Sequence, residues 1–214
     1  MNQFSYKESY RRRLPHIQPP GATLFITFRL AGSIPMNILR ALVEEREQMD
    51  QELARIANKQ ERAKRAYIAE RKFFGKWDKA LDTASNGPYW LREEAIAKLV
   101  VESLHFQDNM RYRLDAFCVM PNHVHMVCTP LETKDGVFYA MSKIMHALKR
   151  YTASEANKIL KRQGDFWHHE NYEHYARDEA EFQRIVNYVL NNPVTAGFVS
   201  TPEEWKWSFC RTNL

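Results

Sequence analysis

Residues 117–128 read FCVMPNHVHMVC, and this stretch predicts the centre of a β-sheet. The apolar and β-branched residues on both sides favour pleated strands, and Pro121-Asn122 supplies the chemistry of a tight turn between them. Side chains at positions i and i+2 of a strand share a face. We therefore expect a β-hairpin whose second strand turns His123 and His125 toward one point.

The histidine pair indicates a metal site, because imidazole is the commonest protein ligand of divalent metals. Such a site needs a third ligand from elsewhere in the chain. For the pair alone, two histidines that hydrogen-bond on a half-exposed strand are the favoured alternative, since so short a motif often occurs by chance. Strand alternation places Cys128 on the opposite face from both histidines, which argues against a structural zinc site.

A helix is predicted over residues 178–192, DEAEFQRIVNYVLNN. Asp178 and Glu181 resemble a capping box at its start, and Pro193 is expected to end it, because proline disfavours helical geometry in the preceding residue. An apolar stripe at i, i+3, i+4 spacing is expected to be buried. Its members are Phe182, Ile185, Val186, Val189 and Leu190.

Tyr188 lies off this stripe, roughly 120° from its centre at about 100° per residue. Asn192 follows four residues later on the same flank, so the helix presents a phenol beside an amide oxygen. A hydroxyl nucleophile next to a possible metal ligand is a catalytic arrangement. The alternative is an amphipathic helix with a half-exposed tyrosine at its boundary and an asparagine that helps to end it.

Together, these motifs resemble those of the single-tyrosine HUH transposases, in which U is a hydrophobic residue. The matching segments are MPNHVHMV at 120–127, Tyr188-x-x-x-Asn192-Pro193-Val-x-Ala-Gly197, and Trp205-x-Trp207-Ser208. Within that superfamily the chain most resembles the REP-associated tyrosine transposases, named for repetitive extragenic palindromes. The resemblance runs from Tyr10 to about Phe209, apart from a longer charged segment after the first strand.

The resemblance implies a set of site residues. His123 and His125 would bind a divalent metal, Mg²⁺ or Mn²⁺, with Asn192 as the third ligand, although the insertion-sequence relatives usually carry Gln there. Tyr188 would be the nucleophile that cuts single-stranded DNA at hairpins and forms a 5′-phosphotyrosine intermediate. In relatives a dimer or a monomer carries out the reaction, so the chain is expected to be a monomer or a homodimer.

The predicted elements follow the order β-α-β-β-α-β-α, which is the ferredoxin-like pattern of an α+β fold. A strand at 22–30 with one packed and one available face comes first, followed by a charged helical elaboration at 36–88. A helix at 91–104, the hairpin strands, a basic helix, an edge strand at 166–168 and the tyrosine helix complete it. One domain over 1–214 is the simplest count.

An excess of 31 Lys and Arg over 26 Asp and Glu gives a net charge of +5, which favours a polyanionic partner. Two basic regions are candidates for contact with DNA hairpins and their single-stranded flanks. The first is an N-terminal arm over 1–20, and the second is the helix between residues 143 and 162. The residues concerned are Tyr10, Arg11, Arg12, Arg13, Lys149 and Arg150.

The three cysteines form no Cys-x-x-Cys motif and suit a reducing compartment. No apolar run is long enough to span a bilayer, so a cytoplasmic protein without a membrane partner is expected. Two other functions fit the same residues. The histidines could activate water in a metal-dependent phosphodiesterase, or the chain could bind hairpin DNA without catalysis.

Overall fold

The computed structural model describes residues 9–11, 15–17, 19–83 and 87–211. The chain divides into two compact units, one formed by residues 1–31 with 89–214 and the other by residues 32–88. The second unit nearly coincides with the predicted helical elaboration. The single-domain count stays a prediction.

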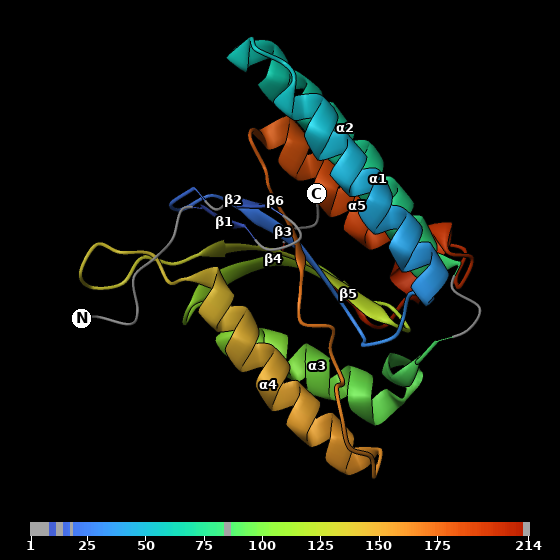
Figure 1. Cartoon of the computed structure of the whole chain (residues 1–214). Helices are drawn as coiled ribbons and strands as arrows, with labels where there is room; N and C mark the ends of the chain where they lie inside the picture. The colour runs from blue at the N-terminus through green and yellow to red at the C-terminus, as the bar shows by residue number, and fades with distance from the viewer. Residues whose placement is uncertain (1–8, 12–14, 18, 84–86, 212–214) are drawn as a thin grey trace. The chain divides into compact units, whose positions relative to one another are not determined.

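The first unit is built on an antiparallel sheet with strand order β6-β3-β5-β4-β7, of which Figure 1 labels β3 to β6. The predicted α+β fold is confirmed, and β7 is added to the expected strands at one edge. The elements are β1 (Ser9–Arg11), β2 (Pro15–Ile17), β3 (Leu24–Arg29), α3 (Glu94–Gln107), β4 (Tyr112–Val119), β5 (His123–Pro130), α4 (Met141–Ile159), β6 (Tyr172–Tyr175), α5 (Glu179–Thr195) and β7 (Ser208–Cys210), with 3-10 turns at Trp90–Arg92 and Pro202–Glu204.

One face of this sheet forms the main hydrophobic core beneath α3 and α4 (Figure 1). Alternation along β3 and β5 supplies the core residues Leu24, Ile26, Phe28, Val124, Met126 and Cys128. Cys128 thus lies on the face opposite His123 and His125, as alternation predicts, and burial raises the pKa of its thiol.

The opposite face, which we call the histidine face, carries Phe25, Thr27 and Arg29 of β3 beside the two histidines of β5. Helix α5 packs on this side, against β4 and β5. The sequence suggested that one face of β3 stays available, and this was wrong. All six residues of the strand are buried, because the core with α3 and α4 covers one face and Tyr188 of α5 packs against Phe25 on the other.

The edge strand lies later in the sequence than predicted. Residues 172–175 form β6 and pair with β3 from Leu24 to Thr27. The predicted segment at 166–168 makes only an isolated bridge, between Trp167 and Leu30. Its backbone still follows β3, since His168 N donates to Arg29 O at 2.8 Å. The apolar residues at 166 and 167 suggested a strand from the sequence, but they are apolar because they pack in the core beside α4.

Helix α5 begins as predicted but ends later. The Asp178 side chain accepts from Glu181 N at 2.7 Å, which caps the first turn. Pro193 lies inside the helix, whose last residue is Thr195. Gly197, two residues later, has a φ of 76°. Phe198 N donates to Pro193 O and Gly197 N to Val194 O, the two bonds of a Schellman motif. Glycine, and not proline, therefore ends this helix.

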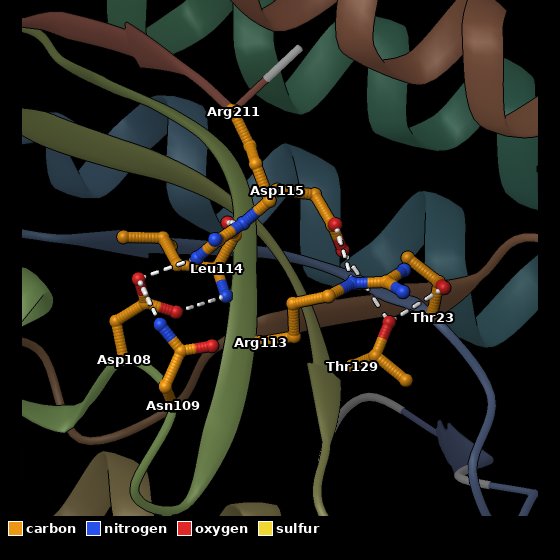
Figure 2. A network of polar contacts seen from close by, with 8 residues as sticks. All are labelled: Thr23, Asp108, Asn109, Arg113, Leu114, Asp115, Thr129 and Arg211. Atoms are coloured by element: carbon orange, nitrogen blue, oxygen red, sulfur yellow. Dashed lines mark hydrogen bonds and ion pairs between the residues drawn. The ribbon is translucent and has the colours of Figure 1, made fainter.

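A polar network joins β4, β5 and the segment after β7 at the end of the sheet away from the histidines (Figure 2). Asp115 sits at a bulge in β4 and accepts from Arg113 at 2.8 Å and Thr129 at 3.3 Å. Burial raises the pKa of Asp115, although these partners favour its charged form. Arg211 donates to Leu114 O at 2.7 Å, and so ties the end of β7 to β4.

The second unit consists of two helices that pair with each other, α1 (Met36–Ala54) and α2 (Lys59–Asp82). Buried Arg46 of α1 makes a bidentate ion pair with Glu70 of α2, with distances of 2.8 and 2.5 Å. Asn58 caps α2 by accepting from Glu61 N. The charged segment is thus a helical hairpin held by its own ion pair.

Part of the predicted N-terminal arm forms strands β1 and β2, which pair antiparallel, with Tyr10 opposite His16. Arg12 and Arg13 lie outside the described residues. Among the helices of the described ranges, we find none that combines the length and the apolar character required to cross a bilayer.

Candidate metal and nucleophile site

The two histidines of β5 converge as the strand spacing predicts. His123 Nε2 and His125 Nε2 lie 3.0 Å apart, and both residues are buried. Each ring is held at its other nitrogen. Asn122 Oδ1 lies 2.7 Å from His123 Nδ1, and Thr27 Oγ1 lies 2.8 Å from His125 Nδ1. The two Nε2 atoms are therefore fixed beside each other.

The partner of His123 defines its tautomer. An amide oxygen only accepts hydrogen bonds, so Nδ1 of His123 donates to Asn122 and its Nε2 carries a lone pair. The Thr27 hydroxyl can accept from His125 in the same way. A ligating histidine usually donates its second ring nitrogen to such a group, which fixes the ring and raises its basicity.

The spacing of the pair fits a shared metal ion. Two imidazole nitrogens that each lie about 2.1 Å from one ion at right angles are roughly 3 Å apart. The observed Nε2–Nε2 distance is 3.0 Å. The donor types and their separation therefore suit a divalent cation, with room in its coordination shell for oxygen ligands.

Tyr188 of α5 lies against the histidine face. Its ring centroid is 5.6 Å from that of His125 and 6.0 Å from that of Phe25. Phe25 also stacks on His125 at 5.6 Å, so three rings from β3, β5 and α5 meet at one place. Tyr188 is half-buried, in keeping with its predicted position at the border of the apolar stripe.

The buried side of α5 is rotated relative to the predicted stripe. Asn192 is 2% exposed and Glu181 5% exposed, whereas Ile185 and Leu190 are only partly buried. At about 100° per residue, Asn192 and Glu181 lie on the flank that carries Tyr188. The helix thus turns this polar flank further toward the sheet than apolar periodicity indicates. Whether Asn192 binds metal stays a prediction.

Buried Glu181 fixes the start of α5 to β6. Its carboxylate lies 3.0 Å from His174 Nε2 and accepts from Arg177 N at 3.1 Å. Sequence analysis assigned Glu181 only a capping-box role. The carboxylate reaches Arg177 and the neighbouring strand instead of the Asp178 backbone, so it sets the position of the helix that carries Tyr188.

The two basic residues predicted on α4 differ in their surroundings. Lys149 donates to His168 O at 2.5 Å, to His169 O at 3.3 Å and to Asn171 Oδ1 at 2.7 Å. Its ammonium group thereby holds the loop before β6. Arg150 is exposed to solvent. Of the two, Arg150 is the better placed to meet an anion.

Sequence reasoning missed Thr27, Asn122 and Phe25, which surround the histidines. A signal existed for Asn122, which directly precedes the pair in the turn. Thr27 and Phe25 belong to β3, almost a hundred residues earlier, and meet His125 only through the strand register. No spacing within the histidine motif could indicate them.

Comparison with known proteins gives a consistent set of similarities. Residues 91–192 match the family described as Transposase IS200 like. A protein of Haemophilus influenzae named as a putative REP-associated tyrosine transposase is 24% identical over 98 residues, covering 44% of this chain and 56% of the relative. A REP-associated tyrosine transposase of Escherichia coli K12 is 26% identical over 97 residues, covering 45% and 53%.

The chain thus spans about half the length of the curated relatives that it matches. A solved structure of a REP-associated tyrosine transposase bound to a REP hairpin aligns with 93% of this chain and 80% of its own. The sequence identity in that alignment is 16% and the TM-score is 0.49.

Proposed function

Residues 91–192 match the family described as Transposase IS200 like, and from this match we propose that the protein cuts and rejoins single-stranded DNA beside hairpins. The predicted resemblance to REP-associated tyrosine transposases is confirmed by the curated relatives. The activity itself is our proposal. One observation carries it, the contact between the ring of Tyr188 and the ring of His125.

In the proposed reaction the Tyr188 phenolate oxygen attacks a backbone phosphorus. A bond forms between that oxygen and phosphorus, and the bond from phosphorus to the 3′ oxygen breaks. The products are a 5′-phosphotyrosine on the enzyme and a DNA end whose 3′ oxygen takes up a proton. The ester conserves the energy of the phosphodiester, so another 3′-OH can reverse the step on a new strand.

The histidine pair would hold the divalent metal, with Asn192 as the proposed third ligand. When bound, Mg²⁺ or Mn²⁺ would neutralise phosphate charge and stabilise the leaving oxygen. The chain's own part is positional. Thr27 and Asn122 fix the two imidazoles, and α5 brings Tyr188 beside them.

We propose DNA hairpins with a single-stranded flank as the substrate, bound by a monomer or a homodimer in the cytoplasm. The odd number of cysteines and the lack of a Cys-x-x-Cys motif in the sequence support a reducing compartment. We propose that Tyr10, Arg11, Arg12 and Arg13 contact the flank.

The test is incubation of the protein with end-labelled single-stranded DNA that contains a palindrome and its flanks. We expect a nicked product and a protease-sensitive covalent adduct, both dependent on Mg²⁺ or Mn²⁺. Nicking without an adduct would instead indicate a water-activating phosphodiesterase. Hairpin binding without nicking would indicate a protein that binds DNA and has no catalytic activity.

A further inference from the structure

A groove lies between α4 and the loop that precedes β6, in the first unit and away from the histidine face. Its volume is about 430 Å³. Apolar side chains of Met145, Ala153 and Trp167 line it from within the core layer, and Arg150 and His169 line its solvent side. The groove thus combines an apolar floor with a polar, basic rim.

The charge of the rim favours an anion. Exposed His146 and Arg150 lie on the α4 side, and exposed His169 lies on the loop side. Asp165 is the one acidic residue among the lining residues that the structure describes, and His169 lies 3.7 Å from the Glu170 carboxylate. A guanidinium flanked by imidazoles suits a phosphate, and the apolar floor suits a flat base.

The groove is held open by bonds that do not involve a ligand. The Lys149 ammonium group donates hydrogen bonds to the backbone oxygens of His168 and His169 and to the side chain of Asn171. These bonds fix the loop to α4. On the other side, Trp167 Nε1 donates to Thr152 Oγ1 at 2.8 Å. The loop therefore needs little ordering when a ligand arrives, which favours binding.

The groove and the histidine pair lie on opposite sides of the sheet but are connected through neighbouring strands. Trp167 bridges to Leu30, and the neighbouring Arg29 pairs with His123 in the β3–β5 register. Two steps of about 4.8 Å between strands thus connect the loop with the histidine strand. A single strand held at the histidines can reach the groove by passing over this edge of the sheet.

We propose that this groove binds one unpaired nucleotide of a single-stranded DNA flank, with its phosphate on Arg150 and its base on the apolar floor. The inference rests on the proposed function and adds a binding site to it. Lys149 serves the groove as a structural residue and not as a phosphate ligand. Arg150, His146 and His169 form the contacting rim.

The experiment compares two DNA ligands, a hairpin with an unpaired flank and the same hairpin without it, by fluorescence anisotropy over a range of salt. We expect Arg150→Ala to weaken binding of the flanked hairpin about tenfold and to lower its salt slope by about 0.7, the value for one single-strand phosphate contact. Binding of the flankless hairpin stays unchanged. Lys158→Ala removes the same charge from an exposed site on α4 outside the groove and is the matched control.

A second pair of variants tests the floor. Ala153→Phe fills the groove, and Ser154→Phe places the same side chain on the exposed side of α4, outside the groove. The first should lose the preference for the flank and the second should keep it. Thermal unfolding of both variants reports whether α4 still packs. If Ala153→Phe is unfolded, the Arg150→Ala result alone tests whether the groove binds the flank.

Equal effects of Arg150→Ala and Lys158→Ala, or full flank preference in folded Ala153→Phe, would overturn the groove proposal. The covalent-adduct assay on the wild-type protein separates this failure from failure of the proposed function. If the wild type forms an adduct but the groove variants bind normally, the transesterase proposal is supported and the groove proposal is wrong. If the groove variants lose flank binding but the wild type forms no adduct, only the binding site is supported.

Discussion

The ring of Tyr188 meets the ring of His125 edge to face, with centroids 5.6 Å apart and planes inclined by 65°. The two residues come from α5 and β5, and Phe25 of β3 contacts both. A phenol is thereby placed next to an imidazole whose other nitrogen is already held by Thr27. This contact is the basis of the proposed transesterification.

Tyr188→Phe should abolish nicking and the covalent adduct, because the variant lacks the attacking oxygen. The ring keeps its packing on Phe25 and His125, so the free energy of unfolding should change by only about 1 kcal/mol or less. Denaturing gels of labelled DNA and a thermal melt measure the two effects. Wild-type nicking by this variant would rule out a single-tyrosine mechanism.

Thr27→Val should weaken metal binding by about 10- to 100-fold, because the hydroxyl that orients His125 is replaced by a methyl group of similar size. Calorimetric titration with Mn²⁺ measures this directly. Thr23→Val is the matched control, since Thr23 directly precedes the same strand and bonds to Thr129 instead, at 2.7 Å. Equal Mn²⁺ affinity in the two variants would contradict the role of Thr27.

His168 should make the protein less stable in acid. Burial, followed by the nearby charge of Arg29, lowers the pKa of His168 to about 3. The unfolded chain binds this proton below about pH 6.5. Stability from this group is therefore complete above pH 6.5 and is lost as the pH falls from there toward 3.

Urea unfolding at pH 7 and pH 4.5 tests this, with His168→Asn as the variant. Asparagine retains an acceptor for Glu170 N, which donates to His168 Nδ1 at 3.2 Å, but it does not titrate. The variant should lose less stability between the two pH values than the wild type. Identical losses would show that His168 does not contribute to the acid sensitivity.

Lys149→Gln should lower the free energy of unfolding by about 1–3 kcal/mol, because its charged hydrogen bonds to the loop before β6 are lost. Chemical denaturation provides the measurement. Lys158→Gln removes a charge of the same kind that is exposed and pairs with half-exposed Glu155 on its own helix, and should be nearly neutral. A neutral Lys149 variant would mean that the loop is held by its core residues alone.

Gly197→Ala should destabilise the protein by about 1–2 kcal/mol, because the residue has a φ of 76°. The added methyl group meets open space, so backbone strain is the only expected cost. Pro193→Ala serves as the comparison, since that position is helical in either case. If Pro193→Ala lowered the free energy of unfolding more than Gly197→Ala does, Pro193 and not Gly197 would be the residue that ends the helix.

Sequence patterns predicted the elements whose signals are local. Strand alternation placed His123 and His125 on one face, and β4 runs over Tyr112–Val119 as expected. The edge strand was predicted at the wrong residues. Phe166 and Trp167 are apolar because they pack in the core beside α4, and they do not form a continuous strand with β3. Local composition cannot separate these two reasons for burial.

The site was predictable only in part, for a related reason. Apolar periodicity identifies the hydrophobic face of a helix. Helix α5 also buries Asn192 and Glu181, which lie at the border of the hydrophobic face that the periodicity predicts. Glu181 is stabilised there by His174 on another strand. Partners of buried polar groups depend on tertiary register, and a single sequence does not reveal that register without a family to supply it.

The position of Tyr188 after the strands has a consequence for synthesis on the ribosome. Tyr188, the proposed nucleophile, leaves the ribosome 63 residues after His125. At about 5–20 residues per second, this delay lasts roughly 3 to 13 s. During that interval the nascent chain has its histidine pair but lacks Tyr188, so in the proposed reaction a partly made protein has no oxygen with which to attach itself to DNA.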